Sequence, residues 1–185
     1  MKNNKEAFRD YLQLEKKYSP HTVLAYWNDI ASFELFNSVH FDQHSIDQVN
    51  YSQIRSWIVS LVDADVSNVS VNRKIASLKA YYKFLLKTKQ IEASPFLKHK
   101  ALKTPKKIQI PFSEKEVDAV LEHLQNPSGF EAIRDKLIID LFYTTGMRRT
   151  ELIHLKMANV NFASSTIKVL GKRNKERIVP ILSVI

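Results

Sequence analysis

The residues best suited to chemistry in this chain lie between Thr144 and Arg177. Arg148 and Arg149 stand where a helix is expected to begin. A predicted hairpin turn, about two dozen residues later, carries four more cations: Lys172, Arg173, Lys175 and Arg177. Arginine binds phosphate through a planar fork of N–H donors, and lysine binds it as a compact charge. The spacing therefore predicts two anion-binding clusters that act together as a phosphate clamp.

Glu151 follows Arg148 by three residues, on the same side of the expected helix. Its carboxylate can hydrogen-bond the guanidinium and fix the direction of the fork. Gly146 can adopt the left-handed conformation that ends a helix, which places Arg148 at a junction. The alternative is an ordinary intrahelical ion pair, because such pairs are frequent and contribute little to stability. A lysine on a hairpin is likewise usually just solvated, so a role for Lys172 depends on its neighbours.

Composition limits the kind of protein that can hold this clamp. The chain has 185 residues, 28 Lys plus Arg against 19 Asp plus Glu, and a net charge of +9, which favours a polyanionic partner. Solvated basic surfaces or an anionic membrane are the alternatives. The absence of cysteine excludes disulfides, thiolate metal sites and cysteine nucleophiles. Because no secretory signal and no long apolar run is present, a cytoplasmic location without membrane attachment is expected.

Apolar residues at helical spacing predict helices over residues 2–16, 20–37, 54–62 and 67–89, with a loop over 39–50. The second helix starts at Ser19-Pro20, an N-cap followed by proline. The last helix is basic around an aromatic core. Near its start, Asn72, Arg73 and Lys74 are predicted to contact phosphate or a DNA groove, and a plain solvated face is the alternative.

Residues 94–111 contain three prolines, five lysines and no acidic residue, which predicts a basic linker between two domains. Its lysines Lys103, Lys106 and Lys107 are expected along a phosphate backbone, where each neutralised phosphate releases counterions, and an ordinary soluble linker is the alternative. Ser113 and Glu116 form a capping box that opens the second domain. A helix over 133–143, apolar on nearly all sides, is predicted to be deeply buried. Residues 166–170 and 176–181 are predicted to pair as a hairpin.

Two segments resemble the tyrosine site-specific recombinases of the phage-integrase family, in particular their Xer-type members. Residues 145–152, TGMRRTEL, are similar to the family's TGxRxxEL box. Residues 171–177, GKRNKER, followed by Val179-Pro180, are similar to its GKGNKERxVP hairpin. Upstream, Ser19-Pro20-His21-Thr22 with Tyr26 and Asp29, the helix from Arg73 to Leu86, and Arg134-Asp135 also resemble the family. The resemblance covers practically the whole chain, and both boxes occur in the expected order.

The resemblance implies a role for each matching residue. Arg148 would bind the scissile phosphate, Glu151 would position the arginine, and Lys172 would protonate the leaving 5′ oxygen. No metal and no cofactor is implied. Arg149 and Arg173 depart from the family pattern. With Lys175 they are expected to add phosphate contacts, and a solvated surface is the alternative. Thr22 joins the residues predicted to bind DNA.

The resemblance also implies a mostly α fold with a small β part. A helical SAM-like core-binding domain (1–100) is expected, then the basic linker (101–111) and the start of an α+β catalytic domain (112–185). The family's His-x-x-Arg box and nucleophilic tyrosine have no counterpart here, since all seven tyrosines lie at or before Tyr143. We therefore expect an N-terminal, truncated portion of a recombinase.

Such a portion is predicted to bind double-stranded DNA without cleaving it. The family implies a homo- or heterotetramer of subunits at synapsis, whereas this chain in isolation is expected to be a monomer. A non-catalytic DNA-binding module, or a regulatory remnant of an integrase, is the alternative. Whether the biological role is chromosome-dimer resolution or integration of a mobile element stays open.

Overall fold

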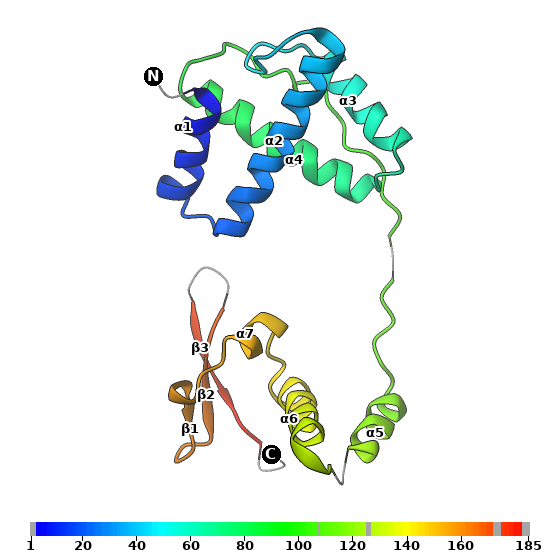
Figure 1. Ribbon diagram of the computed structural model, residues 1–185, viewed down its shortest axis with the longest axis vertical. Helices are drawn as coiled ribbons and strands as arrows, with labels where there is room; N and C mark the ends of the chain where they lie inside the picture. Colours follow the sequence, from blue (N-terminus) through cyan, green and yellow to red (C-terminus); the bar gives the residue numbers. More distant parts are fainter. Residues whose placement is uncertain (1–2, 107, 125–126, 172–174, 183–185) are drawn as a thin grey trace. The chain divides into compact units, whose positions relative to one another are not determined.

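The computed structural model describes residues 3–106, 108–124, 127–171 and 175–182. The chain divides into two compact units, unit 1 (Met1–Lys107) and unit 2 (Ile108–Ile185). Unit 1 is helical, and unit 2 combines helices with a small sheet (Figure 1). The predicted fold class, mostly α with a small β part, is confirmed. Within the described ranges, no helix combines the length and apolarity needed to cross a bilayer.

Unit 1 consists of α1 (Asn4–Asp10), the π-helical turn η1 (Tyr11–Glu15), α2 (Pro20–Phe41), α3 (Tyr51–Asp63) and α4 (Asn68–Lys87). The expected helices are therefore present. Each α-helix begins at a residue whose side-chain oxygen accepts a hydrogen bond from a backbone N–H of the first turn; these caps are Asn3, Ser19, Asn50 and Ser67. Capping of this kind satisfies N–H groups that have no partner within the helix.

Two details of unit 1 differ from the expectation. The predicted loop over 39–50 begins later, because α2 continues to Phe41 and ends at Asp42 in the left-handed conformation (φ 48°). The ring of His40 lies 4.3 Å from that of Phe36, so the last turn of α2 is held by its own side chains. Leu14, one of the apolar residues whose spacing predicts the helix over 2–16, is exposed. The wider π-helical turn shifts the register after Leu12, so Leu14 turns to solvent.

The core of unit 1 forms around α4, which packs against α1, α2 and α3 (Figure 1). Phe33, Trp57, Leu78 and Tyr82 are among its fully buried side chains. The Tyr82 hydroxyl donates to the carbonyl of Ile46 (2.5 Å), so its polar end is satisfied inside the core. Burial of these large aromatic and aliphatic side chains stabilises unit 1.

The first part of the predicted linker folds onto unit 1. Phe96 is buried in the core, and the Asn72 amide pairs with the backbone of Leu102 in both directions, accepting from its N–H (3.0 Å) and donating to its carbonyl (2.9 Å). One turn earlier, Asn68 donates to the carbonyl of Lys103 (2.8 Å). We call residues 96–103 the strap. The strap is part of unit 1 and not a free linker.

Unit 2 begins with α5 (Glu114–His123), α6 (Gly129–Thr145), α7 (Arg149–Ile153) and a short 3₁₀ turn, η2 (Met157–Asn159). The predicted capping box at the start of α5 is present, with the Glu116 carboxylate accepting from the Ser113 N–H (2.8 Å). The sheet follows as β1 (Val160–Asn161), β2 (Thr166–Leu170) and β3 (Glu176–Pro180), antiparallel and in the order β1-β2-β3. The predicted hairpin is confirmed, with Val169 opposite Arg177.

The core of unit 2 is small. Its buried residues come from the end of α6, the loop that follows and the two long strands; they are Leu141, Met147, Ile167, Val169 and Val179. The prediction that the helix over 133–143 is deeply buried is wrong: Leu141 is buried, whereas Ile133, Leu137 and Tyr143 are exposed. Only one side of α6 meets the sheet, and no described element of unit 2 covers its remaining apolar surface.

Candidate phosphate-binding site

A hydrogen-bonded turn after the end of α6 leads to Arg148. The Thr144 hydroxyl donates to the carbonyl of Asp140 (2.6 Å), and the Gly146 N–H donates to the carbonyl of Phe142 (3.0 Å). Gly146 is left-handed (φ 58°), as predicted, which reverses the chain at a position that other residues rarely tolerate. Met147 is then buried, and Arg148 becomes the N-cap of α7. The arginine is therefore fixed at its backbone.

Glu151 is the centre of the site. Its carboxylate accepts four hydrogen bonds: from the Arg148 backbone N–H (2.8 Å), Arg148 Nη1 (2.9 Å), Arg177 Nη1 (2.6 Å) and Arg177 Nη2 (2.7 Å). The Glu151 side chain is only 3% exposed, while that of Arg148 is 67% exposed. The carboxylate is thus held inside the unit, and the arginine extends from it toward solvent.

These contacts favour the charged form of the carboxyl group. The bonds from Arg177, followed by the Arg148 backbone N–H, lower the pKa of Glu151 from 4.5 to about 2. The same contact raises the pKa of Arg177. Both groups are therefore ionised throughout the physiological range. The Glu151 carboxylate engages Arg148 through Nη1, so other donors of this exposed fork are directed to solvent.

The structure brings some of the predicted catalytic residues together. Arg148 and Glu151 are paired, as the Arg-x-x-Glu spacing predicted. Lys172 and Arg173 lie outside the described residues. Lys175 and Arg149 are exposed, and the Lys175 carbonyl accepts from the Gly171 N–H (2.7 Å), which closes the base of the hairpin.

Arg177 is the residue that the local pattern did not single out. It was grouped with the hairpin cations as an anion-binding residue, yet its fork is occupied by both oxygens of Glu151. The two residues are 26 positions apart, so helical spacing gives no sign of the pair. The available sequence signal for this pair was an excess of positive charge: more arginines and lysines surround Glu151 than one carboxylate can pair with.

The predicted DNA-binding residues on α4 have partners within unit 1. The Arg73 fork donates to both oxygens of Asp29 (2.6 and 3.0 Å), and Lys74 reaches the same carboxylate (3.2 Å). Asp29 is buried, whereas the Arg73 side chain is 53% exposed and so presents an oriented guanidinium at the surface. Asn72 binds the strap, which makes its amide unavailable to a groove while that contact lasts.

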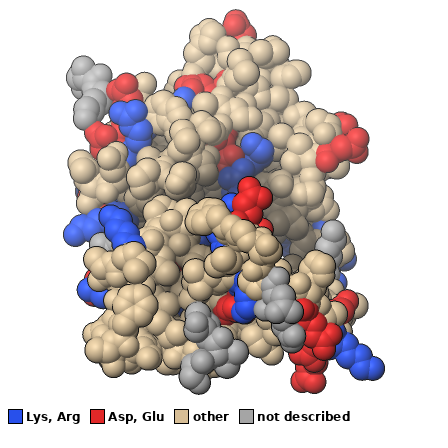
Figure 2. Space-filling model, turned by 60° about the horizontal axis from the view of Figure 1, so that its bottom comes forward, with Lys and Arg blue, Asp and Glu red and all other residues tan. Residues whose placement is uncertain are grey.

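The other predicted contacts in this half of the chain are at the surface or outside the described ranges. The Thr22 hydroxyl bonds that of Ser19 (2.9 Å) at the cap of α2. Lys103 and Lys106 are exposed, and Lys107 lies outside the described residues. On the face shown in Figure 2, Lys and Arg alternate with Asp and Glu over a mostly uncharged surface. The excess positive charge is not gathered into one patch on that face.

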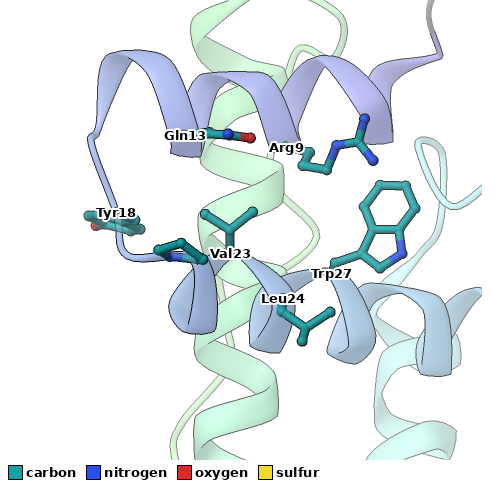
Figure 3. A pocket seen from close by; sticks show the side chains of 7 residues that line it. Arg9, Gln13, Tyr18, Val23, Leu24 and Trp27 are labelled. Atoms are coloured by element: carbon teal, nitrogen blue, oxygen red, sulfur yellow. The ribbon is translucent and has the colours of Figure 1, made fainter. Parts of the chain in front are cut away.

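Unit 1 also has a hollow lined by residues of α1, η1, α2 and the turn before α2. None of the residues predicted to bind DNA lines it. Figure 3 shows Trp27 at one end and Tyr18 at the other, with Val23 and Leu24 between them. The Arg9 guanidinium lies 5.2 Å and the Lys5 ammonium 4.4 Å from the Trp27 ring. These distances suit cation–π contacts, which give the cations a structural partner.

Comparison with known proteins places the chain in a family. The profile of the phage integrase N-terminal SAM-like domain matches residues 6–89, and that of the phage integrase family matches residues 111–184. The chain belongs to the phage integrase family. Among its curated relatives, the chain is 34% identical over 173 residues to the tyrosine recombinase XerC of Pediococcus pentosaceus. It is 36% identical over 177 residues to that of Oceanobacillus iheyensis.

These matches include 94% and 95% of this integrase-family chain, but 58% and 57% of the two relatives. The chain therefore spans less than two thirds of their length. Solved structures agree on the fold. The Tn1549 transposon integrase in complex with circular intermediate DNA has a TM-score of 0.69 at 16% identity, covering 99% of this chain and 62% of that one. A lambda integrase tetramer bound to a Holliday junction has a TM-score of 0.71 at 12% identity, covering 96% and 49%.

Proposed function

We propose that this chain takes part in site-specific DNA recombination, supplying the phosphate-binding part of a tyrosine recombinase active site. The observation that carries the proposal is the exposed Arg148 fork held by the buried Glu151 at a rigid helix junction. A phosphodiester attacked by a tyrosine gathers negative charge on its non-bridging oxygens. A guanidinium already held in position stabilises that charge without having to reorganise. The named activity of the curated relatives agrees with this assignment.

In this proposal Glu151 positions Arg148, and Lys172 protonates the departing 5′ oxygen, as the resemblance implies. The leaving alkoxide needs a proton donor, and a lysine ammonium group can supply the proton. Strand exchange through a 3′-phosphotyrosyl intermediate stores the energy of the broken bond, so no nucleotide is required.

Duplex DNA is the proposed partner. The structurally similar Tn1549 integrase is in complex with circular intermediate DNA, and the similar lambda integrase is a tetramer bound to a Holliday junction. In this chain, the oriented Arg73 and the exposed Lys103 and Lys106 are suited to phosphate contact. We propose a tetramer of recombinase subunits at synapsis.

We further propose that the 185-residue chain alone binds duplex DNA weakly and does not cleave it. All seven tyrosines lie at or before Tyr143, and Tyr143 is the one tyrosine after residue 107 in the sequence. The test is to incubate the chain with nicked suicide substrates and look for a covalent protein–DNA adduct. We expect salt-sensitive binding and no adduct. An adduct that disappears in Tyr143→Phe would overturn this part of the proposal.

The catalytic assignment is tested in a protein that joins this chain to a nucleophilic tyrosine. There, Arg148→Ala is expected to lower the cleavage rate roughly 100- to 1000-fold, the usual cost of removing one group that stabilises a developing oxyanion. Lys172→Ala should slow cleavage and be rescued by a substrate with a better leaving group. Unchanged cleavage in Arg148→Ala would refute the assignment.

A further inference from the structure

Two arginines share one carboxylate beside the proposed phosphate site. Oε1 of Glu151 accepts from Arg148 Nη1 and Arg177 Nη1, and Oε2 accepts from the Arg148 backbone N–H and Arg177 Nη2. Each oxygen thus has one donor from either arginine. The three side chains carry a net charge of +1, because the two guanidinium groups exceed the one carboxylate. Without Arg177, the remaining pair would be neutral.

We propose that Arg177 is a positioning residue for Arg148: it balances the charge of Glu151, so the carboxylate can hold Arg148 in place without cancelling the charge that binds phosphate. This inference rests on the proposed function, in which Arg148 is the phosphate ligand. It concerns a residue that touches no reacting atom and acts through Glu151.

The position of Arg177 suits this role. It lies in β3 opposite Val169 of β2, and Val169 and Val179 on these strands are buried in the core of unit 2. The sheet therefore sets the direction of the Arg177 fork. A Cβ built at Gly171 would be 3.5 Å from Glu151 Oε1 and 3.6 Å from Arg177 Nη1, so the start of the hairpin packs against the pair.

Exposure separates the two arginines. The Arg148 side chain is 67% exposed and engages the carboxylate through Nη1, whereas the Arg177 side chain is 38% exposed and donates to both oxygens. A bidentate pair is the stronger arrangement. Glu151 is therefore held chiefly by Arg177, and the fork of Arg148 is left to face solvent.

The test is a titration of the 185-residue chain with inorganic phosphate, followed by NMR at the Nε–H and backbone N–H of Arg148. We expect wild-type protein to bind phosphate at Arg148 and Arg177→Gln to bind it about fivefold more weakly, a typical effect of one nearby charge at a protein surface. In Arg177→Gln, the pKa of Glu151 should rise from about 2 toward 4.5, because Arg177 is the main cause of its lowering.

A double variant separates charge balance from a merely structural role. In Glu151→Gln/Arg177→Gln the charge on Arg148 is no longer offset, so phosphate affinity should recover relative to Arg177→Gln. If Arg177 only stabilised the fold, the double variant would bind no better than the single one, and the inference would fail. Lys136→Gln is the matched control: it removes a cation of the same unit that pairs with another carboxylate, Asp140 (2.5 Å), and should leave phosphate binding unchanged.

The outcomes distinguish this inference from the proposed function. If wild-type protein shows no phosphate-dependent shift at Arg148, the assignment of Arg148 as phosphate ligand fails. If wild type binds and Arg177→Gln binds equally well, only the role of Arg177 is refuted. Thermal unfolding of every variant establishes that unit 2 is folded during the titration.

Discussion

Glu151 has a structural role in unit 2, and in the proposed site it has a functional one as well. It is buried, it is fully bonded, and each of its bonds comes from an arginine that the proposed site uses. Removing a buried carboxylate from such a set leaves unpaired cations, which is more damaging than the loss of an exposed ion pair. Its effect on stability should therefore depend on pH in a way that identifies it.

The folded-state pKa of Glu151 is about 2, below its ordinary value of 4.5. A lowered pKa means that the ionised carboxylate stabilises the folded state above roughly pH 4.5, and that this stabilisation is lost as the pH falls toward 2. We expect Glu151→Gln to lower the Tm of unit 2 at pH 7, and the difference from wild type to shrink between pH 5 and pH 2. Thermal unfolding across this range measures it.

The matched control for that experiment is Glu122→Gln, which removes an exposed carboxylate from α5 of the same unit. It should unfold like wild type at every pH. A difference between wild type and Glu151→Gln that stays constant from pH 5 to pH 2 would contradict the assigned role of the Glu151 charge.

Among the elements of unit 1, the strap is bound to α4 through the side-chain amide of Asn72. Asn72 bonds both backbone groups of Leu102, in the manner of a neighbouring strand. Asn72→Ala keeps a good helix former in α4 but removes both bonds. We expect a loss of roughly 1 kcal/mol in stability and faster hydrogen exchange at the Leu102 N–H, measured by NMR.

Asn68→Ala provides the comparison, because it removes the bond to the Lys103 carbonyl and leaves the Leu102 N–H paired. Its Leu102 N–H should exchange nearly as slowly as in wild type. Equal protection of Leu102 in wild type and Asn72→Ala would show that Asn72 does not hold the strap.

Local signals account for most of what the sequence predicted at this scale. The cap at Ser19, the Ser113–Glu116 box, the left-handed Gly146 and the hairpin were all predicted, because each depends on residues a few positions apart. The ion pairs of Asp29 with Arg73 and of Glu151 with Arg177 join residues 44 and 26 positions apart. Tertiary packing brings the partners of these ion pairs together, and the local spacing of residues in the sequence does not predict it.

The same limit explains the errors on burial. The apolar pattern of α6 correctly predicted a helix, but how much of a helix is covered depends on elements elsewhere in the fold. The π-helical turn at Tyr11–Glu15 likewise keeps Leu12 in the core and turns Leu14 to solvent. The family resemblance, by contrast, predicted roles for Arg148 and Glu151 from a sequence motif alone.

At the scale of the whole molecule, the excess of cations should appear as a salt dependence. If the exposed lysines at the end of the strap and just after it contact phosphates, each substitution reduces the magnitude of the slope of log affinity against log salt by about 1. For binding to a duplex of random sequence, we expect Lys103→Ala/Lys106→Ala to reduce the magnitude of this salt slope by about 2, as measured by fluorescence anisotropy. Lys115→Ala is the control, since Lys115 stands between Glu114 and Glu116 and should not bind a polyanion.

An unchanged slope in the double lysine variant would remove this segment from the proposed DNA interface. The binding would then depend on other cations, such as the Arg73 that Asp29 orients. Because Arg73 holds a buried carboxylate as well, its substitution affects the stability of unit 1, whereas the lysines make no such contact among the described residues.

The uncovered side of α6 has a practical consequence for work on this chain. Phe130, Ile133, Leu137 and Tyr143 are exposed on the folded helix. Environment-sensitive dyes such as ANS bind apolar surface of this kind, and their fluorescence is often taken as a sign of a molten globule. Here the dye should fluoresce with the native protein. Unfolding is better followed by circular dichroism, because a dye-based melting curve would begin from a high signal.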